Sequence, residues 1–356
     1  MADESRHRRR SGAHAPAHAS HWREDGFSLR IAGAIVCLSM VLATGLGLSA
    51  RASRNTALQA KASASADAMA YDGAAASPDD AASANATDTD DTAATDAANP
   101  TDSATDPALT ARTTAALAGL RADLNSMISG YDGTWSVYAS TLADGNSISI
   151  NSSSTYSASV IKLFIMAAVE QAIESGALAD TPEVENHLEQ MITVSSNDDT
   201  NSLIEILGGG SAEAGLAAVN AFAASQGFAD TTMSELIGLP TGDPNRKQTS
   251  VNDVGRLLSM VYHGTLVNAD ASARMMALLQ AQQLTGKIPA GVPAGTVTAN
   301  KTGEITGVEN DAAVIWTGGA TDYVLVIFSS GVPDSAAARA NITAMSTVAW
   351  NALSAL

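Results

Sequence analysis

The order of apolar and polar positions divides the chain into four segments. Residues 1–30 are polar and basic, and residues 31–50 form an uninterrupted apolar run. Residues 51–108 are mostly small and acidic, whereas residues 109–356 repeat apolar positions with the periods of helices and strands. A helix repeats apolar positions every three or four residues and a half-buried strand every two. We therefore expect one ordered domain at residues 109–356.

Within this domain the pattern predicts strands near both ends and helices between them. Strands are predicted at 134–140, 147–150, 296–301, 312–317 and 323–329. Helices are predicted at 109–129, 159–175, 183–193, 197–207, 212–225, 250–263, 270–282 and 334–354. Asp144-Gly145 is a turn signal that joins the first two strands into a hairpin. The arrangement predicts an α/β (α+β) fold, with helices packed on an antiparallel sheet assembled from both ends of the domain.

The apolar run at residues 31–50 predicts a transmembrane signal-anchor. It contains no charged residue and lies between Arg30 and Arg51. A helix of about 20 residues, rising about 1.5 Å per residue, spans a hydrocarbon core of roughly 30 Å. The arginines of residues 1–30 place this head in the cytoplasm and the rest of the chain outside. We expect a single-pass protein of the cell membrane; secretion after signal cleavage near Ala50 is the alternative.

The segment at residues 51–108 predicts a disordered stalk. It consists largely of Ala, Ser, Thr and Asp, and such a composition buries too little apolar area to offset the entropy of ordering the backbone. The whole chain has a formal net charge of −18. Because the ordered domain also lacks a basic patch, we exclude nucleic acid as a partner.

Cysteine and histidine usage limits the available chemistry. The single cysteine, Cys37, lies in the apolar run, so neither an intramolecular disulfide nor a cysteine-based metal site is expected. The ordered domain has two isolated histidines, His187 and His263. We expect no metal site and no organic cofactor, and we expect a monomer.

Three short motifs in the ordered domain carry the chemistry. They are, in order, Ser159-Val160-Ile161-Lys162, Ser195-Ser196-Asn197 and Lys301-Thr302-Gly303. A serine hydroxyl needs an adjacent base near neutral pH, and residues three apart share one face of a helix. A partly buried lysine near another cation loses its proton more easily. The first motif therefore allows Ser159 to be a nucleophile activated by Lys162, at a helix N-terminus whose N–H groups can receive an oxyanion. Ser-x-x-Lys by itself is common by chance, so the interpretation depends on all three motifs.

Together with their flanking residues, the three motifs resemble those of class A serine β-lactamases and of the penicillin-binding serine hydrolase superfamily. The resemblance covers residues 109–356 and leaves out the anchor and the stalk. It implies a β-lactamase/transpeptidase-like fold, in which a helical subdomain lies beside an α/β subdomain with the active site in the cleft between them.

The resemblance also implies roles for the first two motifs. Ser159 is the nucleophile that becomes acylated, and Lys162 is its base or the partner of its base. Ser195 relays a proton to the leaving nitrogen. Asn197 binds the amide side chain of the substrate, although an asparagine at this point of the sequence also suits a helix N-cap.

The third motif is implied to bind the substrate. Lys301 holds Ser195 and the substrate carboxylate electrostatically, and Thr302 donates a hydrogen bond to that carboxylate. Gly303 belongs to the same substrate-binding strand. The backbone N–H groups of Ser159 and Glu304 form the oxyanion hole.

The chain departs from the family's pattern in its deacylation loop. Class A β-lactamases carry a Glu-x-x-Leu-Asn loop whose glutamate activates the deacylating water, and this sequence has no such motif. Glu235 is the candidate replacement, with a solvated loop carboxylate as the alternative interpretation. Without a positioned general base an acyl-enzyme persists.

Two further departures concern charge and the middle motif. Ser196 replaces the family's aspartate, which we expect to change the support of the loop more than the chemistry. Many relatives place an arginine on the strand after the third motif, where this chain has Asp311. Lys287 is the nearest substitute in the sequence, and we expect it to be solvated.

These observations predict a membrane-anchored, extracytoplasmic acyl-serine hydrolase that opens β-lactam amides through a Ser159 acyl-enzyme, in β-lactam catabolism and the response to antibiotics. Two alternatives remain open. One is a penicillin-binding D-Ala-D-Ala peptidase, whose partner is a peptidoglycan stem peptide instead of a β-lactam. The other is a catalytically silent wall-binding module.

Overall fold

The computed structural model describes residues 106–238 and 244–356. The expected head, the anchor at 31–50 and nearly all of the stalk lie outside these residues. Among the described helices, no single one is long and apolar enough to cross a membrane. One pair of consecutive helices is long and apolar enough only when the two are taken together. These are α5 (Asn197–Leu207) and α6 (Ala212–Ser225), and the chain bends by 86° between them.

A five-stranded antiparallel sheet joins both ends of the domain, as the sequence predicts. The strand order is β2-β1-β8-β7-β6. The strands are β1 (Thr134–Thr141), β2 (Ser147–Ile150), β6 (Thr298–Ile305), β7 (Val308–Ile315) and β8 (Tyr323–Ser330). Val137 of β1 lies opposite Ile150 of β2 on one side and Ile327 of β8 on the other. The early hairpin therefore pairs directly with the last strand.

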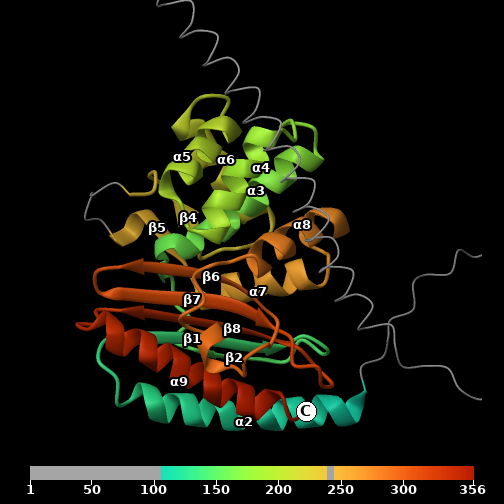
Figure 1. Ribbon diagram of the computed structural model, residues 1–356, viewed down its shortest axis with the longest axis vertical. Helices are drawn as coiled ribbons and strands as arrows, with labels where there is room; N and C mark the ends of the chain where they lie inside the picture. Colours follow the sequence, from blue (N-terminus) through green and yellow to red (C-terminus); the bar gives the residue numbers. More distant parts are fainter. Residues whose placement is uncertain (1–105, 239–243) are drawn as a thin grey trace, which may run out of the picture. The chain divides into compact units, whose positions relative to one another are not determined.

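Helices cover both faces of this sheet (Figure 1). The first and last helices, α2 (Pro107–Ile128) and α9 (Ser335–Leu353), pack against each other and on one face. In α2, Leu117, Leu120 and Leu124 recur at helical spacing and are all buried. They share one apolar core with Leu325 and Ile327 of β8.

The opposite face of the sheet contacts α7 (Val251–Tyr262) and α8 (Ala269–Gln280). Beyond them, α3 (Lys162–Glu174) and α4 (Pro182–Thr193) join α5 and α6 in a helical part, seen in green at the top of Figure 1. Alternate residues of β8, such as Val324 and Val326, belong to this second core. The expected helical subdomain beside an α/β part is thus present.

A small second sheet was not predicted from the sequence. It has the order β3-β5-β4, and its strands are β3 (Thr155–Tyr156), β4 (Thr232–Met233) and β5 (Lys247–Thr249). Short 3₁₀ turns also occur, η1 (Ala158–Ile161), η2 (Pro244–Arg246) and η3 (Pro289–Gly291). Strands of two or three residues are too short for a period-2 pattern to reveal them.

The boundaries of two strands differ from the prediction. The strand expected at 296–301 is β6 at 298–305, and the strand expected at 312–317 is β7 at 308–315. The turn between them contains Gly307 with φ +79°, a conformation that suits glycine. The prediction missed the start of β7 because its buried polar residues Glu309, Asn310 and Asp311 do not follow an apolar pattern, and the end of β6 because Glu304 and Ile305 are exposed.

Candidate active site

Ser159 lies in the 3₁₀ turn η1, immediately before α3 begins at Lys162. Its neighbours Ala158, Val160 and Ile161 are buried, whereas Ser159 is partly exposed. Ala158 has φ +47°, which is uncommon for a residue with a side chain. The turn therefore fixes its apolar residues in the core and presents the serine at the surface.

The segment before Ser159 is held by two strands. The backbone N–H and the Oγ of Ser157 both lie 3.0 Å from the carbonyl oxygen of Lys247 in β5. Asn310 of β7 donates from Nδ2 to the carbonyl oxygens of Ser157 (3.2 Å) and Tyr156 (3.3 Å). Sequence reasoning assigned no role to Asn310. Its role in holding the backbone before Ser159 becomes visible only in the structure, where Asn310 lies on β7 across from Gly303.

Lys162 is fully buried and points into the second motif. Its Nζ donates to the carbonyl oxygen of Ser195 (2.7 Å) and to Oδ1 of Asn197 (2.8 Å), and it lies 3.2 Å from Oγ of Ser195. Burial lowers the pKa of Lys162 to about 7, while the negative charge of Asp199 acts in the opposite direction. Lys162 can therefore exchange its proton near neutral pH.

Ser195 stands between two lysines. Its Oγ is 3.2 Å from Nζ of Lys162 and 2.9 Å from Nζ of Lys301. The backbone of Ser195 adopts φ +59°, a left-handed conformation that costs a residue with a side chain about 1–3 kcal/mol. Burial, and next the positive charge of Lys162, hold the pKa of Lys301 well below its usual value. Both lysines thus contact the hydroxyl group of Ser195, an arrangement through which a proton can be transferred.

Ser196, and not Asn197, caps α5. The side chain of Ser196 accepts from the N–H of Asp199, and Asn197 is the first helical residue. The carboxamide of Asn197 is consequently available to Lys162. The three residues of the second motif thus have separate tasks, since Ser195 and Asn197 face Lys162 while Ser196 starts the helix.

The third motif lies on β6 and contacts the nucleophile segment. A Cβ on Gly303 would lie 2.9 Å from the backbone nitrogen of Ser159 and 2.8 Å from the carbonyl oxygen of Ser157. This contact brings β6 against the N–H of Ser159, where the oxyanion hole is expected. Thr302 is buried, and the side chain of Glu304 turns to Arg339 of α9 at 2.8 Å.

Replacing Gly303 by alanine is expected to slow acylation of Ser159 by about 10- to 100-fold, because the new methyl group pushes β6 and the Ser159 turn apart. Overpacking should also lower the free energy of unfolding by about 1–3 kcal/mol. Gly286→Ala is the matched control, since no atom lies within 4 Å of the added Cβ. Acylation rates and chemical denaturation of both variants measure these effects. An unchanged acylation rate for Gly303→Ala would contradict the close contact.

Glu235 is buried, so the interpretation as a solvated loop carboxylate is wrong. It pairs with the buried ammonium group of Lys247, and Arg246 lies 3.7 Å from its second oxygen. Breaking such a buried pair costs about 3–5 kcal/mol. The structure thus gives Glu235 a role in holding its loop, while its assignment as a deacylation base stays a prediction.

The same loop presents different residues to the second motif. Asn201 of α5 accepts from the N–H of Ile237 (2.9 Å) and donates to its carbonyl oxygen (3.1 Å). A Cβ on Gly238 would lie 3.4 Å from Nδ2 of Asn197. Among the described residues of this loop, Gly238 therefore lies beside Asn197 and Ile237 is fixed to Asn201, and neither carries a carboxylate.

Lys287 is buried, which contradicts the expectation that it is solvated. It forms ion pairs with Glu309 (2.6 Å) and Glu304 (3.6 Å). Arg339 bridges the same two carboxylates. Asp311 is also fully buried and accepts from the N–H of Ile288 at 2.9 Å. These charges compensate one another within the fold, which the sequence pattern did not reveal.

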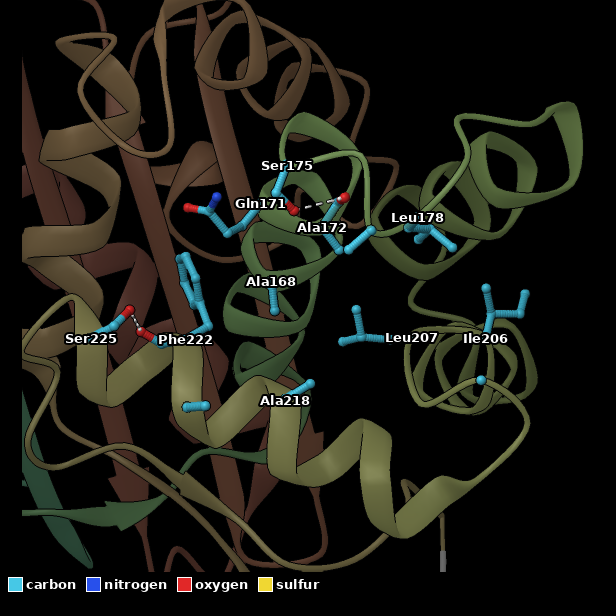
Figure 2. A pocket seen from close by; sticks show the side chains of 13 residues that line it. Ala168, Gln171, Ala172, Ser175, Leu178, Ile206, Leu207, Ala218, Phe222 and Ser225 are labelled. Atoms are coloured by element: carbon cyan, nitrogen blue, oxygen red, sulfur yellow. Dashed lines mark hydrogen bonds between the residues drawn. The ribbon is translucent and has the colours of Figure 1, made fainter.

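The structure also has a cavity of about 610 Å³ that is separate from the site. It lies between α3, α5 and α6 and is lined mostly by small or apolar side chains such as Ala168, Leu207 and Phe222 (Figure 2). The lining part of α3 begins two turns after Lys162. None of the motif residues lines this cavity, so we assign it no part in the chemistry. Within residues 106–238 and 244–356, no group of three or more His, Cys, Asp or Glu residues is placed to hold a metal ion.

The sequence and the fold have relatives among known proteins. The model of a family described as the beta-lactamase enzyme family matches residues 119–185 and 179–353. No curated protein matches the sequence. Three similar solved structures are described next, and at identities below 25% they establish the fold alone.

The protein PBP-A is 22% identical, covers 67% of this chain and 97% of its own, and has a TM-score of 0.60. A beta-lactamase from Xanthomonas campestris pv. campestris is 20% identical, with coverages of 67% and 98% and a TM-score of 0.60. A beta-lactamase from Sphaerobacter thermophilus is 24% identical, with coverages of 67% and 98% and a TM-score of 0.59. The fold inferred from the motifs is confirmed.

Proposed function

Because the chain belongs to the beta-lactamase enzyme family, within the superfamily of β-lactamase and penicillin-binding serine hydrolases, we propose that it opens β-lactam amides through an acyl-enzyme on Ser159. The observation that carries this proposal is the position of Ser195 Oγ, 3.2 Å from Lys162 and 2.9 Å from Lys301. A silent binding module has no need of a hydroxyl held in strained backbone between two buried lysines.

The proposed reaction combines these contacts with the roles that the family resemblance implies for Ser159 and Lys162. Neutral Lys162 takes the proton of Ser159 Oγ, and this oxygen attacks the carbonyl carbon of the lactam. The backbone N–H groups of Ser159 and Glu304 stabilise the oxyanion. As the C–N bond breaks, Ser195 Oγ passes its proton to the leaving nitrogen and is reprotonated by Lys162, which is left neutral. The serine is then esterified, and no atom of the lactam has been lost.

Substrate binding follows from the third motif and Asn197. Lys301 and Thr302 bind the carboxylate of the substrate, and Asn197 binds its amide side chain. Because burial lowers the pKa of Lys301 in the free protein, an arriving carboxylate favours its protonated form and supplies the missing counter-charge. The family supports a β-lactam as the ligand.

The acyl-enzyme is proposed to persist. Hydrolysis of the ester needs a general base for water, and Glu235 is committed to a buried pair with Lys247. Among the described loop residues, Gly238 lies beside Asn197 and Ile237 is hydrogen-bonded to Asn201, and neither has a carboxylate. The same observation favours a second function, in which Ser159 reacts with D-Ala-D-Ala stem peptides of peptidoglycan and β-lactams act as inhibitors. A mutant of PBP-A has been solved as an acyl-enzyme complex with penicillin G.

The time course of intact-protein mass tests this function. The full-length chain is mixed with benzylpenicillin, and an adduct with the whole mass of the penicillin is expected because ring opening loses no atom. Persistence of the adduct over hours supports slow deacylation. Absence of an adduct would overturn the proposal. Rapid decay with release of product would show fast hydrolysis, and a lifetime lengthened by Glu235→Gln would then identify Glu235 as the base.

We further propose that this domain acts outside the cell, tethered through residues 31–50. The uncharged run between Arg30 and Arg51 supports this placement. The chain is expected in the membrane fraction and to resist extraction by alkaline carbonate. Recovery of the chain in the medium, shortened at its N-terminus, would instead support signal cleavage.

A further inference from the structure

The turn that supplies Ser195 and Asn197 is tied to the neighbouring helix by three polar side chains. Asp199, in the first turn of α5, accepts a short hydrogen bond from Oγ of Ser196. The N–H of Asp199 donates back to that Oγ at 3.3 Å. The second carboxylate oxygen of Asp199 lies 2.7 Å from Nδ1 of His187 in α4. We call these three residues, His187, Asp199 and Ser196, the α4–α5 clamp.

The clamp is a charged contact. Burial alone would raise the pKa of Asp199, but hydrogen bonds from Ser196 and His187 bring it below its usual value. Asp199 is therefore a carboxylate, and His187 Nδ1 carries the hydrogen that it donates. Both side chains are largely shielded, with 19% and 22% exposure for His187 and Asp199, so solvent screens their interaction only in part.

The clamp acts on the residues that surround Lys162. Between α4 and α5 the chain has only residues 194–196, and the N–H of Ser196 donates to the carbonyl oxygen of Gln190 at 3.1 Å. This short turn contains the strained Ser195. Nζ of Lys162 donates to the carbonyl oxygen of Ser195 and to the side chain of Asn197, and it lies 3.3 Å from the carbonyl oxygen of Ser196. A shift of α5 relative to α4 would therefore move the hydrogen-bond acceptors of the base.

The clamp also acts through its charge. Among the causes that set the pKa of Lys162, Asp199 is the one that raises it, against the lowering by burial. The hydrogen bonds from Ser196 and His187 keep Asp199 ionised and in place, so its effect on the pKa of Lys162 is maintained. Asp198, the adjacent residue in the same first turn, is exposed.

We propose that His187 and Asp199 are positioning residues for the acylation of Ser159. Together with Ser196 they replace the structural role of the aspartate that this chain lacks at the centre of its second motif. The clamp holds the turn in which Ser195 is strained, and it keeps a negative charge close to Lys162. This inference rests on the proposed function, since it concerns the rate at which Ser159 becomes acylated.

The test uses the full-length chain and benzylpenicillin, with acylation rates measured by intact-protein mass between pH 5 and pH 9. Asp199→Asn keeps the shape of the side chain and removes its charge. It is expected to slow acylation by about 10- to 100-fold, because the turn loses its anchor. The substitution also removes the negative charge that favours protonated Lys162, so the pKa of Lys162 should fall. The acylation rate is then expected to increase at a lower pH than in the unchanged chain. A merely structural role would lower the rate without moving this rise.

Two variants of His187 test whether Asp199 needs a hydrogen-bond donor at this position. His187→Ala removes the donor to Asp199 and is expected to slow acylation about tenfold or more. His187→Gln keeps a donor and is expected to restore most of the rate. Asp198→Asn is the matched control in the same helical turn, with rate and pH profile like the unchanged chain. Thermal unfolding of each variant verifies that the domain remains folded.

The outcomes distinguish the two proposals. If the unchanged chain forms no adduct, the proposed function fails and the inference falls with it. If the unchanged chain is acylated while Asp199→Asn and His187→Ala keep its rate and its pH profile, the inference alone is wrong. If Asp198→Asn shifts the profile as much as Asp199→Asn does, the effect belongs to the charge of the helix terminus and the clamp is overturned.

Discussion

Replacing Ser159 by alanine is expected to abolish the covalent adduct with benzylpenicillin. The variant lacks the oxygen that forms the ester in the proposed reaction, whereas Ser195, whose Oγ lies 3.2 Å from Nζ of Lys162, is proposed to transfer a proton. Loss of the nucleophile in serine hydrolases reduces turnover by about 10⁴- to 10⁶-fold. Intact-protein mass after prolonged incubation, at penicillin concentrations that fully label the unchanged chain, measures the effect.

A matched control for this variant is Ser153→Ala, an exposed serine in the preceding loop. It is expected to be acylated like the unchanged chain. The fold should survive in Ser159→Ala, because the side chain is partly exposed and the change removes one oxygen. An adduct of undiminished yield in Ser159→Ala would place the nucleophile elsewhere and refute the assignment of the first motif.

Acylation is expected to become faster as pH rises through about 7, where burial places the pKa of Lys162. The base is the neutral amine, whose fraction grows as pH rises past the pKa. About one unit below the pKa, only about a tenth of the molecules carry a neutral Lys162, so the rate there should be about tenfold below its maximum. Samples quenched at set times and analysed by intact-protein mass, over a series of pH values, give the dependence of the acylation rate on pH.

Replacing Lys162 by arginine should remove this behaviour. Arginine keeps the positive charge and the hydrogen-bond donors but does not lose its proton in this pH range. Acylation is expected to fall by about 10²- to 10⁴-fold, as for loss of a general base, and to lose its rise near pH 7. Lys287→Arg is the control, since Lys287 is a buried lysine paired with Glu309 and Glu304. A rise near pH 7 that persists in Lys162→Arg would assign the base to another group.

The amino-acid sequence by itself determined the fold class and predicted the serine chemistry that we propose for this protein. Ser159 and Lys162 are three residues apart, and this spacing places both on one face of any helical segment. In the structure Ser159 lies in η1 and Lys162 begins α3. The eight helices of the described residues were predicted within a few residues, because their apolar positions recur with the helical period. The five strands of the main sheet were predicted to exist for the same kind of reason, although β6 and β7 were displaced.

Only the tertiary structure decided which polar groups meet. Lys301 reaches Ser195 across more than 100 residues of sequence, and Asn310 holds the backbone before Ser159 from another strand. Glu235 and Lys287 look like surface charges in the sequence, and both are buried in ion pairs. Periodicity reports which residues avoid water, but a buried charge is stable only when a partner compensates it. Such partners come from distant segments, so only the fold brings Lys162 and Lys301 to Ser195 and pairs Glu235 with Lys247.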